Sequence, residues 1–375
     1  MNPAQTKRAE TCALRVNPQL TDHDHYLDWK DHTREEVLRV LEVTRLLKEA
    51  HRQGVRPQIL SGKVLGMMFF ESSLRTRVSF EAAMAQLGGH AEFLTPKTMH
   101  VGDGNESMRD TAEVLSRMCD AILIRAEDDA VTREFAKFSY CPVIDGGGMS
   151  YHPSQVIADV FTMQEHLPGV PFEDMTVMFM GDNNNDSQFA CVPVQRSLMN
   201  ICAILGMRYI ACSPESLQPT AEDVATFERL AELNGSGAQL VVTDDPDEHI
   251  AEADFLVGEV FTFKGMAEHT GLSDEELRAV RWDVLYPKYQ INAELVAKAK
   301  PTVGVMHCMP GNRDEEITTE VWDGPHSLLF EEAENRLHAQ KGICACVMYD
   351  GEPPAPLVAY HTGRVEAALA ETLAY

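Results

Sequence analysis

The chain lacks three features that would each point to a particular class of protein. Its 375 residues contain no apolar stretch of the roughly 18 residues that a membrane-spanning helix needs. The N-terminal stretch MNPAQTKRAETCALRVNPQL has no apolar signal core and no cleavage site. Nine cysteines include no CxxC pair, which fits reduced thiols better than a disulfide framework. We therefore expect a soluble, cytoplasmic protein without membrane contact.

Positive charge is also scarce. The chain has 32 Lys and Arg residues against 58 Asp and Glu residues, a formal net charge of −26. Such a surface repels nucleic acids and anionic membranes, so neither is an expected partner. Any anion-binding site must be a local cluster of arginines within a negative overall field.

What the chain has in abundance is alternation between short apolar runs and helical patterns. Strands are expected at 64–70, 121–124, 142–144, 176–180, 209–212, 240–243, 253–257 and 303–306, and helices at 34–53, 107–118, 153–166, 197–205 and 221–233. Strands that alternate with helices indicate βαβ units. The length suits two domains of roughly 150 residues each. We therefore predict an α/β fold with two domains, each a parallel sheet covered by helices on both faces.

The expected domain limits follow from loops and strand order. A first domain would span 1–150 and end at a Gly-rich loop, a second would span 151–335, and C-terminal helices over 336–375 would return to the first domain or to a neighbouring subunit. In parallel sheets, ligands bind at the carboxyl ends of the strands. The residues just after each strand are therefore the ones to examine for chemistry.

The stretch SSLRTR follows the first of these strands. We expect the next helix to begin around Thr76 to Ser79, which places Ser73, Arg75 and Thr76 at a helix N-terminus. Unpaired backbone N–H groups and the helix dipole favour an anion there, and guanidinium forks suit a phosphate dianion. The alternative is an ordinary N-cap with surface arginines.

Four more segments carry polar residues at strand ends or helix starts. Arg125 ends the strand AILIR, and His152 precedes a proline-initiated helix with Gln155 in its first turn. Cys308 follows the strand VGVM, and Arg336 lies inside a predicted helix. Taken singly, three of these residues also fit ordinary structural roles. His152 is equally a helix cap, Cys308 a packed core thiol, and Arg336 one half of a surface ion pair with Glu331 or Glu332.

Taken together, the motifs SxRTR, LIR, HPxQ, HCMP and ENRLHAQ, in that order and spacing, resemble the aspartate/ornithine carbamoyltransferase superfamily. The resemblance extends from about residue 30 to about residue 345. The segments RTRVSFEAAMAQLGGHAEFL, LYPKYQIN and FEEAENRLHAQK are most similar to those of ornithine and putrescine carbamoyltransferases.

The resemblance implies a site for carbamoyl phosphate. Its residues would be Ser73, Leu74, Arg75, Thr76, Arg125, His152, Gln155 and Arg336, with Arg125, His152 and Cys308 in catalytic roles. An amine would attack the carbamoyl carbon, a tetrahedral intermediate would form, and phosphate would leave. This chemistry depends on positioning and oxyanion stabilisation, and needs no metal or organic cofactor. His307 beside Cys308, without a second ligand pair, makes a poor zinc site.

The implied acceptor site departs from the family pattern. Its residues would be Asn184, Glu259, Lys264, Gly265, Met266, Cys308 and Met309. Glu259 stands where ornithine enzymes have Asp, and Lys264 would repel a second ammonium group. The acceptor is therefore either an ornithine-like or putrescine-like amine, with Lys264 pointing to solvent, or a different carboxylate-bearing amine such as ureidoglycine or lysine.

Two further features follow from the resemblance. The loop over 181–199 is long and carries Pro193, like the proline-rich loop of the knotted transcarbamylases, although knots are rare enough that we expect an unthreaded loop. Family members of this type form trimers in which a neighbouring subunit completes the pocket, and the matching segment here is Gly102 to Ser107. A non-catalytic phosphate-binding homologue is the rival from another class. An intact carbamoyl-phosphate motif set speaks against it.

Overall fold

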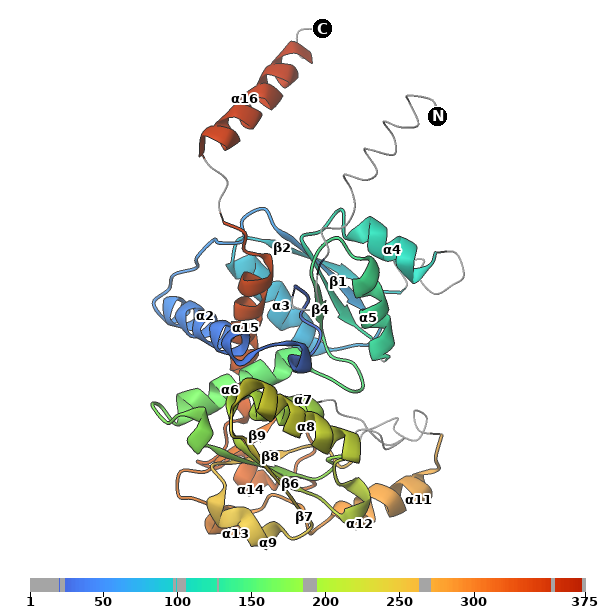
Figure 1. Cartoon of the computed structure of the whole chain (residues 1–375), viewed down its shortest axis with the longest axis vertical. Coiled ribbons are helices and arrows are strands. Elements are labelled where there is room, and N and C mark those ends of the chain that lie inside the picture. Colours follow the sequence, from blue (N-terminus) through green and yellow to red (C-terminus); the bar gives the residue numbers. More distant parts are fainter. Residues whose placement is uncertain are drawn as a thin grey trace.

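Two parallel β-sheets form the framework of the computed structural model, which describes residues 20, 24–96, 99, 106–126, 128–184, 194–262, 271–351 and 355–372. The first sheet has the order β2-β1-β3-β4, and the second has the order β7-β6-β5-β8-β9. The strands are β1 (Val64–Phe69), β2 (His90–Leu94), β3 (Ala121–Arg125), β4 (Val143–Asp145), β5 (Thr176–Met180), β6 (Arg208–Cys212), β7 (Gln239–Thr243), β8 (Phe255–Gly258) and β9 (Gly304–His307). The predicted α/β fold with two parallel sheets is thus confirmed (Figure 1).

Helices alternate with these strands along most of the chain. The α-helices are α2 (Arg34–Arg52), α3 (Leu74–Gln86), α4 (Met108–Leu115), α5 (Asp129–Phe138), α6 (Pro153–His166), α7 (Val194–Leu205), α8 (Ala221–Asn234), α9 (Pro246–His249), α11 (Asp274–Leu277), α12 (Asp283–Leu285), α13 (Ala293–Lys298), α14 (Thr319–Trp322), α15 (Leu329–Met348) and α16 (Ala355–Thr372). One-turn helices lie at η1 (Trp29–Asp31), η2 (Phe172–Asp174), η3 (Glu215–Leu217), η4 (Ile250–Glu252) and η5, a π-helix (Arg278–Trp282). Parallel neighbours need such crossovers, since a tight hairpin joins only antiparallel strands.

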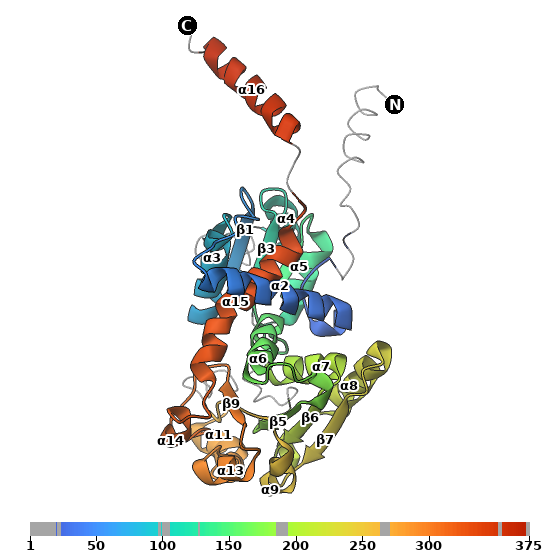
Figure 2. The same cartoon turned by 90° about the vertical axis from the view of Figure 1, so that its left-hand side faces the viewer.

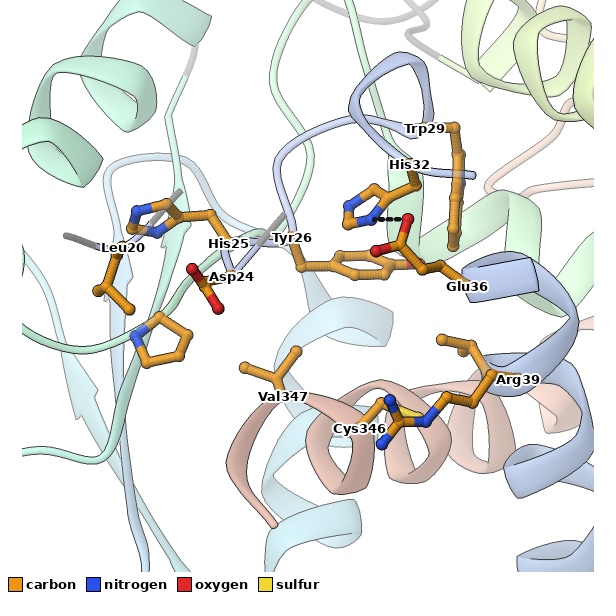
Figure 3. A pocket seen from close by; sticks show the side chains of 12 residues that line it. Leu20, Asp24, His25, Tyr26, Trp29, His32, Glu36, Arg39, Cys346 and Val347 are labelled. Atoms are coloured by element: carbon orange, nitrogen blue, oxygen red, sulfur yellow. Dashed lines mark ion pairs between the residues drawn. The ribbon is translucent and has the colours of Figure 1, made fainter. Parts of the chain in front are cut away.

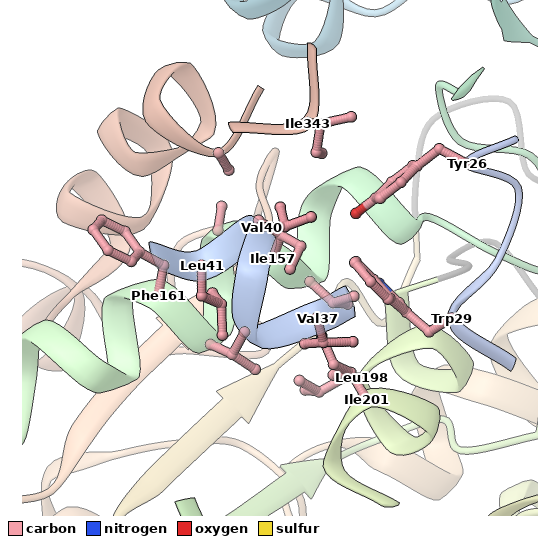
Figure 4. Packing of buried hydrophobic residues seen from close by; sticks show 14 of the residues in the cluster. Tyr26, Trp29, Val37, Val40, Leu41, Ile157, Phe161, Leu198, Ile201 and Ile343 are labelled. Atoms are coloured by element: carbon pink, nitrogen blue, oxygen red, sulfur yellow. The ribbon is translucent and has the colours of Figure 1, made fainter. Parts of the chain in front are cut away.

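Two helices join the sheets. Figure 2 shows α6 between the two sheets, with α15 running alongside from the β9 end of the second sheet to the first. Helix α15 packs on α2, α3 and α6. The apolar cluster at this junction is drawn in Figure 4, where α2 side chains meet those of α6, α7 and α15; it includes Val37, Leu41, Ile157, Phe161, Leu198, Ile201 and Ile343. One continuous core therefore holds the two sheets in a defined relation.

The segment before α2 is fastened to the start of α6. The Tyr26 hydroxyl and the Trp29 indole N–H both donate to the carbonyl oxygen of Pro153, at 3.4 and 3.1 Å. A cavity of about 350 Å³ lies where this segment meets α2 and α15 (Figure 3), and its wall includes the ion pair between His32 and Glu36. None of the predicted site residues lines this cavity.

Helix α16 is the one long element that stands clear of the rest of the described chain (Figures 1 and 2). Its residues Leu357, Val358 and Tyr360 are each about half exposed. Across the described ranges, no helix is long and apolar enough to cross a lipid bilayer.

Candidate active site

A short loop connects β1 to α3, so the N-terminus of α3 lies at the carboxyl end of the buried strand β1. Ser73 is the N-cap of α3 and its hydroxyl accepts from the Thr76 N–H at 3.4 Å. The helix begins at Leu74, so the predicted start around Thr76 to Ser79 was wrong by a few residues. The Ser73 cap explains the difference, because it lets Arg75 and Thr76 enter the first turn. The Leu74 side chain is 75% exposed, so its contribution to a site is limited to its backbone N–H.

Arg125 reaches the same edge from β3, because it pairs in register with Phe69 of β1. Its Nη1 donates to the carbonyl oxygen of Gly146 at 2.9 Å. Gly147 is the residue that makes room for this guanidinium. It has a φ of +106°, and a Cβ there would collide with Arg125 Nη1 and lie 3.0 Å from His152 Nε2. A glycine at this point of the loop therefore lets Arg125 and His152 approach each other.

His152 lies just before α6, where its backbone N–H donates to the Ser197 hydroxyl at 2.9 Å. Its Nδ1 is 3.3 Å from the Ser154 hydroxyl. Burial lowers the pKa of His152 well below its ordinary value, and the positive charges of the neighbouring arginines lower it further. The imidazole is therefore neutral near pH 7. When Ser154 donates to Nδ1, Nε2 carries the hydrogen and can donate to a carbonyl oxygen.

Arg336 is buried inside α15, with 3% exposure, and connects three helices. Its Nη1 donates to the Gln155 side-chain oxygen, and its Nη2 donates to the Thr76 hydroxyl at 3.2 Å. The Gln340 amide, turned to present its oxygen, accepts from Nε at 2.9 Å. Burial lowers the pKa of Arg336 to about 10, which still leaves it charged at neutral pH. The alternative of a surface ion pair with Glu331 or Glu332 is excluded.

Three guanidinium groups thus converge on one place. Arg75, Arg125 and Arg336 lie within electrostatic range of one another. Burial is the main cause that lowers the pKa of both Arg75 and Arg125. In the described part of the chain, none of the three comes within ion-pairing distance of a carboxylate. Like charges held together in a partly buried place repel, and an anion bound between them relieves that repulsion.

The loop after β9 lies beside this cluster. The Cys308 thiol is within electrostatic range of Arg75 and Arg336, and its Sγ is 3.3 Å from Glu259 Oε1. Glu259 follows directly after β8 and is 4% exposed. Burial raises the pKa of both the Cys308 thiol and the Glu259 carboxyl well above their ordinary values. The thiol therefore stays protonated at neutral pH and can donate a hydrogen bond.

His307 fixes the conformation of this loop. Its Nδ1 accepts from the Met309 N–H at 2.9 Å, and its Nε2 lies 3.1 Å from Glu316 Oε1. Met309 has a positive φ of 55°, which is uncommon for a residue with a side chain. His307 is thus occupied by structural contacts.

The loop after β5 contributes the remaining described residues on the acceptor side. The Asn183 amide is fully used, since it donates to the Ser213 hydroxyl at 2.6 Å and accepts from the Tyr209 hydroxyl at 3.0 Å. Asn184 is half-buried and its backbone N–H donates to Asp182 Oδ1 at 2.8 Å. Lys264, Gly265 and Met266, the loop over 185–193 and most of the segment from Gly102 to Ser107 lie outside the described residues.

Sequence reasoning missed several residues that shape this site. Asp182 forms a buried ion pair with Arg281, whose Nε also donates to the Phe261 carbonyl at 2.6 Å. Asp182 was visible as part of the GDNNN loop after a strand, but Arg281 lies in an amphipathic stretch with no distinguishing signal. Asp159 and Glu332, which contact Gln155, were likewise unassigned.

Comparison with known proteins agrees with this geometry. A family model described as the carbamoyl-phosphate-binding domain of aspartate/ornithine carbamoyltransferase matches residues 24–165, and one described as the Asp/Orn-binding domain matches residues 173–347. The chain belongs to the aspartate/ornithine carbamoyltransferase family. It is therefore a carbamoyltransferase.

Relatives within the carbamoyltransferase family carry two different names. A putrescine carbamoyltransferase from Mycoplasma capricolum is 38% identical over 355 residues, 92% of each chain. An ornithine carbamoyltransferase from Bacillus subtilis is 41% identical over 316 residues, 83% of this chain and 91% of its own. The solved ornithine carbamoyltransferase of Pyrococcus furiosus has a TM-score of 0.77 and 36% identity, covering 88% of this chain and 98% of its own.

Proposed function

We propose that the cluster at the N-terminus of α3 binds carbamoyl phosphate. The observation that carries this is the convergence of Arg75, Arg125 and Arg336 without a carboxylate partner in the described chain. In this proposal the N–H groups of residues 73–76, with the Ser73 and Thr76 hydroxyls and Arg75, hold the phosphate. The protein thus supplies a fixed anion site despite its negative net charge.

The remaining donor-side residues act on the carbamoyl group. Arg125 and the Nε2–H of His152 donate to the carbonyl oxygen. Gln155 and Arg336 position the carbamoyl N–H₂ group and the phosphate. The amine nitrogen bonds to the carbonyl carbon and negative charge develops on the carbonyl oxygen. The C–O bond to phosphate then breaks, and the departing phosphate takes the proton that the amine loses. Fixed donors to such an oxygen are each worth about 3 kcal/mol in the transition state.

We propose that the acceptor is an ornithine-like amino acid or a putrescine-like diamine. Glu259 and Cys308 lie next to the donor cluster. The Glu259 carboxyl accepts a hydrogen bond from the amine of the substrate, and the Cys308 thiol holds that carboxyl in place. Asn184 and Met309 would complete the same side. The two names among the relatives are consistent with either compound.

A second acceptor class is favoured by one residue of the sequence. Lys264 is a positive group in the expected acceptor loop, and it fits a carboxylate-bearing amine such as lysine or ureidoglycine better than a diamine. If the enzyme carbamoylates diamines alone, the proposal that Lys264 lines the acceptor pocket is wrong.

We also propose a cytoplasmic homotrimer, as the family resemblance implies. Leu74 and Val78 on α3 are 75% and 51% exposed beside the donor cluster. An apolar face at the edge of an active site is consistent with a neighbouring subunit there. Light scattering that gives the mass of one chain would contradict the trimer.

The donor site is tested by comparing Arg75→Ala with Arg77→Ala. Arg77 lies on the same turn, but it is exposed and pairs with Glu81 at 3.1 Å. We expect Arg75→Ala to lower kcat/KM for carbamoyl phosphate about 10²-fold or more, since a phosphate contact is lost. Arg77→Ala should stay within about threefold of the parent enzyme.

Phosphate release with ornithine and with putrescine measures both variants. A folded Arg75→Ala enzyme with normal kcat/KM would overturn the assignment of this cluster as the donor site.

A further inference from the structure

Two buried carboxyl groups between the sheets accept hydrogen bonds from the same amide nitrogen. Asp159 of α6 and Glu332 of α15 are each 2% exposed. The Gln155 side-chain N–H₂ donates to Asp159 Oδ1 at 2.7 Å and to Glu332 Oε1 at 3.1 Å. Neither carboxyl has an ion-pair partner within the described ranges. The two carboxyls therefore contact the candidate active site through the side chain of Gln155.

Glu332 has a second contact on the acceptor side. Its Oε2 accepts from the backbone N–H of His307 at 2.9 Å. His307 immediately precedes Cys308 and holds the loop that carries it. One carboxyl thus contacts both the Gln155–Arg336 arrangement and the Cys308 loop, although Gln155 and Glu332 are 177 positions apart in the sequence.

The two carboxyls cannot both be ionised in this place. Burial raises the pKa of both groups, to about 7 for Asp159, and the negative charge of Asp159 raises the pKa of Glu332 further. A hydrogen bond from Glu332 lowers the pKa of Asp159 in part, so the two groups are within hydrogen-bonding range of each other. The other titratable or charged groups that face them are Arg336 on α15, Cys202 on α7 and Cys308 after β9. Among the groups of the described chain that face the pair, only Arg336 carries a positive charge, so one negative charge is compensated and the second is not.

This arrangement determines which way Gln155 points. Both of its N–H bonds are directed to the carboxyls, so its oxygen must face Arg336. Arg336 is then held with Nη2 on Thr76. The orientation of a buried arginine in the donor site therefore depends on the two carboxyls behind it.

We propose that Asp159 and Glu332 are a proton-sharing pair of positioning residues, which orients Gln155 and Arg336 and ties the donor site to the Cys308 loop. The inference rests on the proposed carbamoyl-phosphate site. In this pair Glu332 carries the proton and donates a hydrogen bond to Asp159. The pair touches neither substrate and acts through the residues that do.

The test compares Glu332→Ala with Glu332→Gln. Glutamine replaces the carboxyl with a group that does not titrate: its oxygen still accepts from His307 and its N–H₂ donates to Asp159, while the contact from the Gln155 N–H₂ is lost. We expect Glu332→Ala to lower kcat/KM for carbamoyl phosphate about 10²-fold, the size of effect that a small misplacement causes. Glu332→Gln should recover most of this loss, to within about tenfold of the parent, because it keeps the contacts to His307 and Asp159 and loses only the one from Gln155. The neighbouring exposed Glu331, changed to Ala and to Gln, serves as the matched control.

A pH profile separates positioning from a merely structural role. In the parent enzyme, KM for carbamoyl phosphate should rise at alkaline pH as the pair loses its proton and places a second negative charge behind Arg336. Glu332→Gln has no such proton, so this alkaline rise should be absent. The comparison needs only the parent and Glu332→Gln, so it stands even when Glu332→Ala does not fold.

Two results would overturn the proposal that Asp159 and Glu332 act as a proton-sharing pair. One is a Glu332→Gln enzyme with the same alkaline rise in KM as the parent, and the other is a folded Glu332→Ala enzyme with normal kcat/KM. Arg75→Ala, run alongside, keeps the two proposals apart. An inactive Arg75→Ala enzyme beside a normal Glu332→Ala enzyme refutes the pair alone, whereas a normal Arg75→Ala enzyme refutes the donor site.

Discussion

Gly147 leaves the space that Arg125 and His152 occupy at the site. Its positive φ and the absence of a side chain let Arg125 and His152 share one side of the cluster. We predict that Gly147→Ala lowers kcat about 10²-fold, because a methyl group there displaces the Arg125 guanidinium. Gly54→Ala is the control, since Gly54 also has a positive φ, of 78°, but has open space around it. Its cost should be limited to about 1 kcal/mol of stability.

Steady-state rates, together with melting temperatures, measure both glycine variants. Equal loss of stability with equal, near-normal kcat would show that the space beside Arg125 is not needed.

Individual residues also show how far sequence reasoning reaches. The positions of Ser73, Arg125, His152 and Cys308 follow from strand ends and helix starts, which local patterns reveal. Two partners of Arg336, Thr76 and Gln155, do not, because they come from α3 and α6, far away in sequence. Burial of Arg336, Asp159 and Glu332 also runs against the ordinary preference of charged residues for solvent.

Helix α15 is the element on which both the fold and the site depend. Gly342 lies where α15 meets α2: a Cβ there would collide with the Thr44 hydroxyl and lie 3.1 Å from the Val40 carbonyl oxygen. We predict that Gly342→Ala destabilises the protein by about 1–3 kcal/mol, since the two helices must move apart. Gly363→Ala in α16 has open space and should be neutral or slightly stabilising.

Urea unfolding of the two helix variants gives the comparison. A Gly342→Ala protein as stable as the parent would mean that the contact between α2 and α15 adjusts without cost.

Most elements were predicted from local pattern, and the exceptions have physical reasons. Helix α6 and strand β5 were predicted with the observed bounds, because each is apolar and clearly delimited. Strand β2 was missed, since it is an edge strand with partly exposed residues and no continuous apolar run. Helix α5 was missed although Val131, Phe135 and Phe138 follow a helical spacing.

At the scale of the whole molecule, the two sheets present their strand ends to one region. Arg75 after β1 and Arg125 at the end of β3 form the positive donor cluster together with Arg336 of α15. Residues after β5, β8 and β9 supply Asn184, Glu259 and Cys308. A chain with a net charge of −26 therefore brings three arginines together where the sheets meet. This division fits two substrates, one anionic and one an amine. The domain limits at 150 and 335 remain predictions.

The central claim is that these two sides transfer a carbamoyl group from phosphate to an amine. The most direct measurement incubates the protein with ¹³C-labelled carbamoyl phosphate and, separately, ornithine, putrescine, lysine, acetylornithine and ureidoglycine, and identifies the labelled product by NMR. We predict a carbamoylated product, with matching phosphate release, for at least one amine. Ornithine or putrescine as the preferred acceptor would support the first proposal, and lysine or ureidoglycine would support a role for Lys264. The absence of any carbamoylated amine, with no binding of carbamoyl phosphate by the intact protein, would contradict the account.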